Sequence, residues 1–549
     1  MSITIVEARS VITMDPGLPR ATAVAVRGGR ILAVGDSDKI QQDWGPATVN
    51  RDYADAIITP GFVEAHSHVL DGAVWAMPYI GYFDRRSPDG TIIPGCTTID
   101  AVIERLQAEE ALLGDPAKPL MAWGLDPIYM PGERLVASHL DRVSTTRQVF
   151  VFHASGHLAT VNTALMVAEG FADGTSTPGV PLGPDGKPNG ELQEPAAIGL
   201  ARTAAIMLRD IIGSPEALER FGQSARVAGI TTITELGAVA IDRAQQLETW
   251  MRVTDDESFP ARTVPFYNPG SNGAEPDAIA DMVLGIGSAG SDKLLLGRVK
   301  MVLDGSIQGF TARLNQPGYL GDRPNGLWLI APERFAALFR AFHSRRITVH
   351  VHCNGDEAVD LFLDTVEAIL WDDPWADHRH TVQHCQLTTP SQYRRMAKLG
   401  VNANIFSNHI FYWGDQHRDI TVGFDRASKM DACATAGRLG VSYSIHSDAS
   451  VTPLGHLHTM WCAVNRLTAS GTVLGPDERI SVADAMAATT INAAYQLQLD
   501  DLIGSLEAGK FADMTVLAED PFEVDPVRLK DIAVLDTILS GVPTSSTVA

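Results

Sequence analysis

Eight short β-type runs in the middle of the chain constrain its fold more than any other feature. After the second run, roughly 20–40 residues separate successive runs, which is the length of a βα repeat. Strands that alternate with helices in this way favour a parallel sheet or a barrel. We therefore expect an α/β fold whose strands lie within AIITPGFVEAHSH, GITTITELG, ARTVPFYN, GRVKMVLDG, RITVHVHCNG, HTVQHCQL, GVNANIFSN and GVSYSIHSDAS.

One interval breaks this regular spacing. About 160 residues separate the first and second runs, far more than a single crossover needs, so we predict an insertion over residues of about 72–215. This segment contains β-like runs of its own, PLMAWGLD and RQVFVFHASGHLATVN, and a loop rich in glycine and proline.

Both ends of the chain have a different pattern from the middle. ITIVEARSVITM and ATAVAVRGGRILAVG alternate apolar and polar positions, and the last fifty residues contain the short β-runs FADMTVLA and DIAVLDTILSG. We expect residues 1–58 and 498–549 to form one composite β-sandwich domain, with residues 59–497 as the central domain.

Composition narrows the functional classes. Of the 549 residues, 45% are hydrophobic and 20% are charged, as in ordinary globular proteins. The net charge of −23 argues against nucleic acid or an anionic membrane as a partner, and no apolar run reaches the ~18 residues of a transmembrane helix. The five cysteines lack paired spacing and the N-terminus lacks the apolar core of a signal peptide, so we expect a cytoplasmic protein.

The first candidate for chemistry is the pair His66 and His68, which closes the first run. Side chains at positions i and i+2 of a strand point to the same face, so both imidazoles can reach one metal ion. An HxH pair is a weak motif by itself, because two solvent-exposed loop histidines would give the same pattern. Its position after a buried strand favours the metal site.

Metal-capable residues also occur at the ends of other predicted strands, where barrel enzymes build their active sites: Lys300, His352, His384 and Asp448. Each has a structural alternative. His350 or His352 could be a satisfied core histidine, and Asp448 could cap a helix. Their joint occurrence at equivalent positions favours a metal centre.

Lys300 is the most informative of these residues. A lysine in a buried strand is costly as a bare ammonium group. Three alternatives remain open: the group extends to the surface, it is neutral with a depressed pKa, or it has reacted with carbon dioxide to give a carbamate that bridges two metal ions.

At the level of motifs, the chain resembles the amidohydrolase superfamily, specifically family 3, the branch of N-substituted formamide deformylase-like metal-dependent hydrolases. The resemblance covers nearly the whole chain and keeps the motifs in order. They are GFVEAHSH, VKMVLDGSIQGFTA, VHVHCNGDEAVD, VQHCQL, SDASVTP and GSLEAGKFADMTVL.

This resemblance implies a distorted (β/α)8 TIM barrel and a binuclear metal centre of zinc, or of manganese or iron, with one or two ions bound. It implies that His66 and His68 bind one ion, and that carboxylated Lys300 bridges to a second ion bound by His352 and His384. Asp448 would bind the first ion or the attacking water and transfer its proton.

Other residues are assigned to the substrate by the same resemblance. His157 lies in a segment whose histidine faces the substrate and would be catalytic, while Asn162, Asp126 and Glu194 lie in further family-like segments. Asp304 is expected to organise its loop.

The sequence also departs from the family pattern. Glu235 ends the second run where Asp or His is expected, and His446 stands where a small residue is common. The segment FSNHIFYWGDQH, with His409, Tyr412 and Trp413, is distinctive. It either lines the substrate pocket or is a loop packed by its own aromatic side chains.

The resemblance implies hydrolysis of an amide-type C–N bond in a small molecule by metal-activated hydroxide, and a homodimer. Because fold does not fix reaction, a deaminase, an ester or lactone hydrolase and a decarboxylase remain alternatives. A non-enzymatic scaffold is a remote alternative, since it predicts missing ligands and none is missing here.

Overall fold

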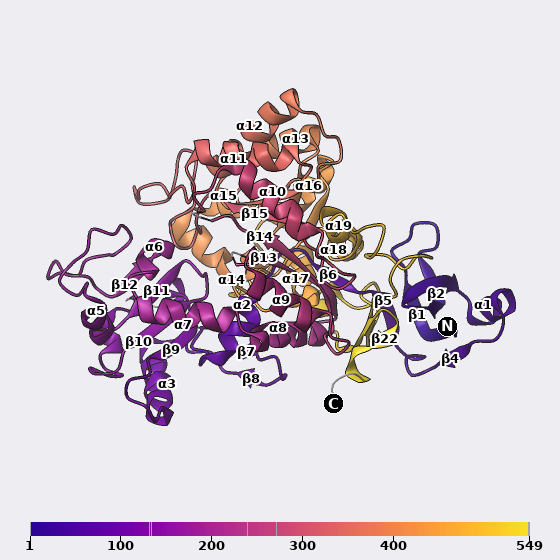
Figure 1. The fold of residues 1–549 in the computed structure, drawn as a ribbon, viewed down its shortest axis with the longest axis horizontal. Coiled ribbons are helices and arrows are strands. Elements are labelled where there is room, and N and C mark those ends of the chain that lie inside the picture. The colour runs from indigo at the N-terminus through magenta and orange to yellow at the C-terminus, as the bar shows by residue number, and fades with distance from the viewer. Residues whose placement is uncertain (1, 131, 133, 239, 271, 547–549) are drawn as a thin grey trace. The chain divides into compact units, whose positions relative to one another are not determined.

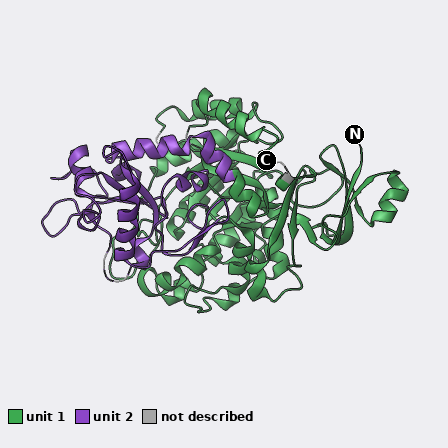
Figure 2. Ribbon diagram, turned by 90° about the horizontal axis from the view of Figure 1, so that it is seen from below, with its two compact units in different colours: residues 1–68, 222–448, 454–549 green, residues 69–221, 449–453 purple. Residues whose placement is uncertain are grey.

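A computed structural model describes residues 2–130, 132, 134–238, 240–270 and 272–546. The chain divides into two compact units, coloured separately in Figure 2. Unit 1 contains residues 1–68, 222–448 and 454–549, and unit 2 contains residues 69–221 and 449–453. Among the residues described, no helix is long and apolar enough to cross a membrane.

An eight-stranded sheet forms the centre of unit 1 (Figure 1), and the hydrogen-bonding pattern shows that its strands follow one another in chain order. Every neighbouring pair is parallel, which confirms the predicted parallel α/β arrangement, and each of the eight predicted runs contributes one strand. The strands are β6 (Phe62–Glu64), β13 (Ile230–Ala238), β14 (Arg262–Tyr267), β15 (Arg298–Val302), β16 (Val349–Cys353), β17 (Thr381–His384), β18 (Asn402–Ile405) and β19 (Tyr443–Ile445).

This sheet is curled, because the carboxyl ends of its two outermost strands are bonded to each other. The amide of Asp448, beyond β19, donates to the carbonyl of His66, beyond β6, over 3.1 Å. The Glu64 carboxylate accepts hydrogen bonds from Ser447 Oγ at 2.6 Å and from the Ser447 amide at 3.2 Å. These bonds bring residues at the two ends of the sheet into one site.

The first predicted run forms two strands rather than one. β5 (Ile57–Pro60) belongs to the terminal sheet, and β6 begins the parallel sheet. Gly61 separates them at a close approach, because a Cβ atom there would lie 2.0 Å from Thr231 Oγ1. Only glycine lets the chain pass from one sheet to the other at this point.

The terminal sheet combines strands from both ends of the chain, in the order β22-β21-β20-β5-β1-β2-β3, with β4 paired to β1. Its core side chains include Val11, Val24, Ile58, Val516 and Ile538. The remaining strands are β1 (Thr4–Ile12), β2 (Arg20–Arg27), β3 (Arg30–Gly35), β4 (Thr48–Asn50), β20 (Met514–Leu517), β21 (Val534–Leu539) and β22 (Val542–Pro543).

Helices fill the intervals between the parallel strands and pack apolar faces inward. In α12, the side chains of Phe362, Val366 and Ile369 are buried at helical spacing. The helices of unit 1 are α1 (Ser37–Trp44), α9 (Ala244–Thr254), α10 (Pro276–Gly287), α11 (Pro332–Ser344), α12 (Asp356–Asp372), α13 (Pro390–Leu399), α14 (Asn408–Gln416), α15 (Phe424–Ala427), α16 (Cys433–Arg438), α17 (His456–Asn465), α18 (Val482–Ala488) and α19 (Ile491–Gln496), and α8 (Pro215–Val227) spans the boundary.

Unit 2 has its own four-stranded sheet, in the order β12-β11-β10-β9. The predicted run PLMAWGLD forms β9 (Leu120–Leu125), and the second predicted run forms β10 (Val149–His153) and β11 (Leu158–Val161). The remaining strands and α-helices are β7 (Arg85–Arg86), β8 (Ile92–Ile93), β12 (Glu191–Gln193), α2 (Leu70–Ala73), α3 (Ile99–Leu112), α4 (Ala137–Leu140), α5 (Thr163–Glu169), α6 (Glu194–Ile198) and α7 (Arg202–Ile212).

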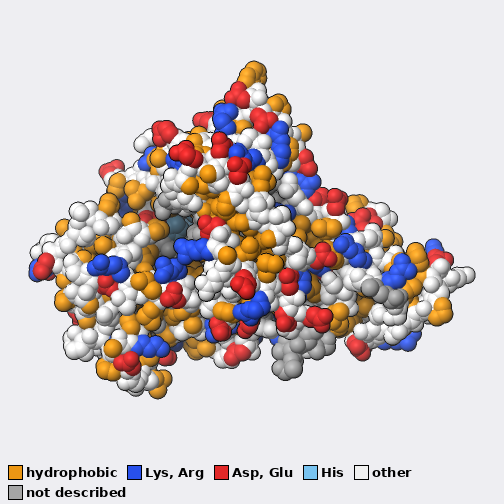
Figure 3. All heavy atoms as spheres, viewed as in Figure 1, with side chains coloured by type: hydrophobic (Ala, Val, Ile, Leu, Met, Phe, Trp, Pro, Cys, Tyr) orange, Lys and Arg blue, Asp and Glu red, His pale blue; other side chains and the backbone are white. Residues whose placement is uncertain are grey.

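The surface carries both signs of charge. On the face drawn in Figure 3, acidic side chains lie among lysines and arginines although the net charge is −23. A mixed surface of this kind keeps a protein dispersed without creating one dominant field.

Candidate metal centre

Six side chains that the sequence singles out all belong to unit 1, at or near the carboxyl ends of its parallel strands. They are His66 and His68 after β6, Lys300 in β15, His352 in β16, His384 at the end of β17 and Asp448 after β19. Active sites of barrel enzymes lie at this end of the strands.

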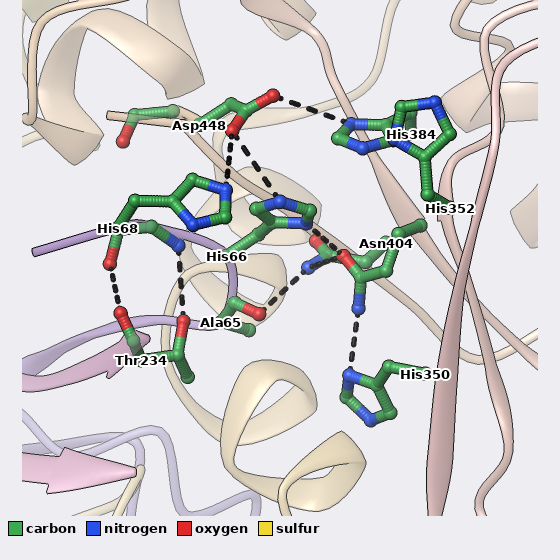
Figure 4. Close-up of polar contacts among 12 residues, drawn as sticks. Ala65, His66, His68, Thr234, His350, His352, His384, Asn404 and Asp448 are labelled. Carbon is green, nitrogen blue, oxygen red and sulfur yellow. Dashed lines mark hydrogen bonds and ion pairs between the residues drawn. The ribbon is translucent and has the colours of Figure 1, made fainter. Parts of the chain in front are cut away.

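The Asp448 carboxylate contacts three histidines of this group, His66, His68 and His384 (Figure 4). Its Oδ1 atom is 3.4 Å from both His66 Nε2 and His68 Nε2, and Oδ2 is 3.7 Å from His384 Nδ1. Two ligands about 2.1 Å from a tetrahedral ion lie about 3.4 Å apart, so the spacing of Asp448 and the two histidines suits one ion.

Backbone geometry at the centre is strained at two of these residues. His384 has a φ of 75° and Asp448 has a φ of 52°, in the left-handed region that residues other than glycine rarely adopt. Strain of this kind persists where the surrounding structure holds a side chain in a required direction.

A hydrogen bond fixes the tautomer of His66. Its Nδ1 atom lies 2.6 Å from Gln383 Oε1, an atom that can only accept, so Nδ1 carries the proton and Nε2 keeps its lone pair. Gln383 is itself held by His350 and Asn404, at 2.8 Å each. Outer contacts of this kind orient metal-binding histidines.

His384 is buried, yet within the described part of the chain neither of its ring nitrogens has a hydrogen-bond partner. Its ring lies 4.5 Å from those of both His66 and His352, between centroids. A buried imidazole without a hydrogen bond is costly, and a metal ion would satisfy it.

The structure distinguishes His350 from His352. His350 is the satisfied core histidine, because Nδ1 accepts from Gln383 and Nε2 lies 3.3 Å from the Gln496 carbonyl. His352 Nε2 lies 3.1 Å from Asn354 Nδ2. Asp304 organises this loop as predicted, accepting from the amide of Asn354 at 3.0 Å.

Lys300 is 2% exposed, and no hydrogen bond or ion pair of its ammonium group is found among the described residues. Burial lowers its pKa to about 8 despite the nearby carboxylate of Asp448. The surface alternative for this lysine is therefore wrong. A depressed pKa also makes the neutral amine accessible, which is the form that reacts with carbon dioxide.

Electrostatics separate the histidines into two kinds. Burial, with the charge of Lys300, holds the pKa of His66 well below its usual value, so its imidazole is neutral. Burial also lowers the pKa of His68, but hydrogen bonds to Asp448 and Glu235 outweigh this and raise it to about 9. Burial raises the pKa of Asp448, yet the bond to His68 brings it below its usual value.

Two residues of the centre were not anticipated from the sequence. Gln383 orients His66, and Glu64 joins the loops that carry His66 and Asp448. Glu64 is fully buried. Burial raises its pKa to about 8, although the three hydrogen-bond donors around its carboxylate lower it. A glutamate inside an apolar strand was the available signal, whereas nothing local marks Gln383.

Both departures from the family pattern lie at this centre. Glu235 Oε1 is 3.4 Å from His68 Nδ1, so the end of the second strand supports a candidate ligand. His446 stacks on His66, with ring centroids 4.6 Å apart and planes 19° apart.

The remaining predicted site residues of unit 1 lie on α14. His409 and Trp413 are buried and stacked, with centroids 4.5 Å apart, and His409 Nδ1 is bonded to His417 Nε2 at 2.8 Å. Tyr412 packs against His458. The segment is thus a helix with stacked aromatic side chains, and its contact with substrate stays a prediction.

Four predicted residues lie in unit 2. His157 Nδ1 is 2.9 Å from Glu194 Oε2, so these two form a pair. Asp126 caps a turn by accepting from the Ile128 amide at 3.0 Å. Asn162 caps α5 and uses both carbonyl lone pairs and both amide protons within unit 2, which gives it a structural role.

Comparison with known proteins extends these observations. A family model described as "Amidohydrolase family" matches residues 51–545. The chain is 28% identical to Protein LONG AFTER FAR-RED 3 of Arabidopsis thaliana, over 94% of this chain and 87% of that protein. It is 25% identical to N-substituted formamide deformylase of Arthrobacter pascens, over 97% and 96% of the two chains.

A solved structure shares the fold. An uncharacterized metal-dependent hydrolase from Pyrococcus horikoshii OT3 superposes with a TM-score of 0.70 at 20% identity, covering 96% of this chain and 99% of that chain. The relationship that the motifs indicated is confirmed by these matches.

Proposed function

The chain belongs to the amidohydrolase family and is a hydrolase, and we propose that it uses a divalent metal ion to cleave an amide-type C–N bond in a small molecule. The observation that carries this proposal is the convergence of His66 Nε2 and His68 Nε2 on Asp448 Oδ1, at 3.4 Å each. Nitrogen and oxygen donors at that spacing suit zinc, or manganese or iron.

We assign the first ion to His66, His68 and Asp448. A second ion would be held by His352 and His384, with a carboxylated Lys300 bridging the two. The burial of Lys300, which is 2% exposed, supports this assignment, because a carbamate becomes an anionic ligand where an ammonium group is costly. The two ring nitrogens of His384, which have no hydrogen-bond partner among the described residues, support it as well.

When bound, the ion lowers the pKa of water and polarises a carbonyl oxygen. The attacking water carries a proton that must be transferred to the leaving nitrogen. Asp448 would accept the proton of the attacking water on a carboxylate oxygen and deliver it to the nitrogen as the C–N bond breaks. The lowered pKa of Asp448 keeps this carboxylate ionised and ready to accept.

The substrate class is inferred from the relative that carries a defined activity by name, N-substituted formamide deformylase, to which this chain is 25% identical. That name supports an amide-type bond and leaves the groups on either side of it open.

The test is a screen of purified, metal-loaded protein against formamides, larger amides, esters, lactones and amino-heterocycles, with amine or ammonia detection. We expect turnover of an amide and its loss after chelation. Lys300→Ala should lose activity, and a short carboxylic acid should restore part of it. Turnover of esters or amino-heterocycles alone would replace the amide assignment, and turnover that survives chelation would refute the metal-dependent mechanism.

We also propose the predicted division into a composite terminal β-sandwich domain, 1–58 with 498–549, and a central barrel that carries the insertion. The terminal sheet built from both chain ends supports the first part. A cytoplasmic location is supported by five buried free cysteines. The homodimer and the absence of nucleic-acid binding stay predictions, which light scattering and a binding assay would test.

A further inference from the structure

We propose that His446 is a ligand of the metal centre, forming with His66 and His384 an all-histidine set that is an alternative to the set of His66, His68 and Asp448. This inference rests on the proposed metal-dependent function and deepens it. His446 lies one residue beyond β19, two residues before Asp448, so one short segment would supply both a nitrogen and an oxygen ligand.

Geometry brings the three rings together. One ring nitrogen from each of His66, His384 and His446 lies within 4.8 Å of the other two. The ring of His446 is 4.6 Å from that of His66 and 5.1 Å from that of His384, between centroids. Zinc sites with three histidine ligands use this set of donors.

The described neighbours of His446 offer no hydrogen bond to its ring nitrogens. It is fully buried, and neither ring nitrogen has a hydrogen-bond partner within the described ranges of the chain. Buried polar groups are nearly always bonded, so two such atoms call for an explanation. A metal ion would satisfy one of them directly.

Packing alone does not explain a histidine here. The ring stacks on two flat neighbours, His66 and Phe406, with planes 19° and 25° from parallel. A phenylalanine would stack in the same place without burying two nitrogens that lack partners. The stacking therefore fixes the plane of the ring, while the nitrogens require a different account.

The two ligand sets share His66, and this sharing has a chemical consequence. The Nδ1 atom of His66 is committed to Gln383, so only Nε2 can bind an ion, and it binds one ion at a time. The set with Asp448 mixes nitrogen and oxygen, whereas the set with His446 is all nitrogen. Imidazole ligands suit zinc, copper and nickel, while oxygen-rich sets suit manganese, so His446 would shift the centre towards zinc.

His446→Phe tests this proposal, because it keeps the stacked ring and removes both nitrogens. We expect the variant to bind Zn²⁺ at least about tenfold more weakly in chelator competition, because removing a contact at a metal site commonly has an effect of that size. Binding of Mn²⁺ should change less. X-ray absorption of the zinc-loaded variant should show one imidazole fewer than the parent protein. The metal-free variant should unfold at or above the parent's temperature.

Two further variants keep the outcomes separate. Phe406→Leu removes the other stacking ring and leaves the His446 nitrogens, so an equal loss of zinc affinity there would assign the effect to packing and overturn the proposal. Asp448→Asn reports on the centre itself. If Asp448→Asn weakens binding and His446→Phe does not, only the role of His446 fails. If neither variant changes zinc binding, the proposed metal centre fails as well.

Discussion

Replacing Gln383 by methionine tests whether the orientation of His66 determines metal binding. The substitution keeps the length of the side chain and removes the acceptor that lies 2.6 Å from His66 Nδ1. His66 can then place its proton on either nitrogen, and the tautomer with Nε2 protonated cannot bind an ion. Loss of a contact that orients a ligand commonly weakens metal binding by about 10–100-fold, and we expect that range here.

His350→Met is the matched control for this experiment. It removes the other histidine bonded to Gln383, at 2.8 Å, and leaves the bond from Gln383 to His66 in place. Both variants leave buried polar groups without partners, at a cost of about 1–3 kcal/mol for each group, so both should be less stable. Only Gln383→Met should lose zinc affinity, measured by competition with a chromophoric chelator. Unchanged affinity in a folded Gln383→Met protein, or equal losses in both variants, would refute the reasoning.

Three further predictions concern the scaffold. Gly355→Ala should prevent stable folding, because the alanine Cβ atom would lie 1.8 Å from the Arg313 carbonyl oxygen. Soluble yield and circular dichroism would show the loss of folding, and a normal thermal transition would contradict the prediction. Arg262→Met should cost about 3–5 kcal/mol in urea unfolding by leaving Asp513, now bonded at 2.7 Å, as an unpaired buried charge, and replacing both partners with apolar residues should cost less. Burial lowers the pKa of His350 in the folded protein to about 3, so below pH 6.5 the unfolded chain binds a proton that the folded protein does not. The free energy of unfolding of the wild type therefore falls by about 1.4 kcal/mol per pH unit below pH 6.5, and the stability difference between wild type and His350→Met should shrink from pH 7 to 5. A stability difference that stays constant with pH would show that His350 does not titrate on unfolding.

The parallel sheet and the candidate ligands were predictable because their signals are local. Each strand shows as an apolar run, and a metal-capable residue at its end is recognisable from the sequence alone, as at His384 and Asp448. Parallel strands bring their carboxyl ends to one edge, so positions far apart in the sequence could be assigned to one site.

The outer contacts were not predictable for the opposite reason. Gln383 matters because of His66, which is 317 positions away, and no pattern around either residue records that bond. His350 and His352 share one strand face, and only contacts from other elements, with Gln383 and the Gln496 carbonyl, identify the first as a core histidine. The split of the first run at Gly61 likewise depends on a tertiary neighbour, Thr231.

Anomalous diffraction at the zinc absorption edge, from crystals of the zinc-loaded protein, tests the central claim most directly. The account predicts a peak about 2.0–2.1 Å from His66 Nε2, within bonding distance of further ligands from the set His68, His384, His446 and Asp448. A zinc-loaded crystal with no peak beside His66, or with its peak at residues outside this set, would contradict the account.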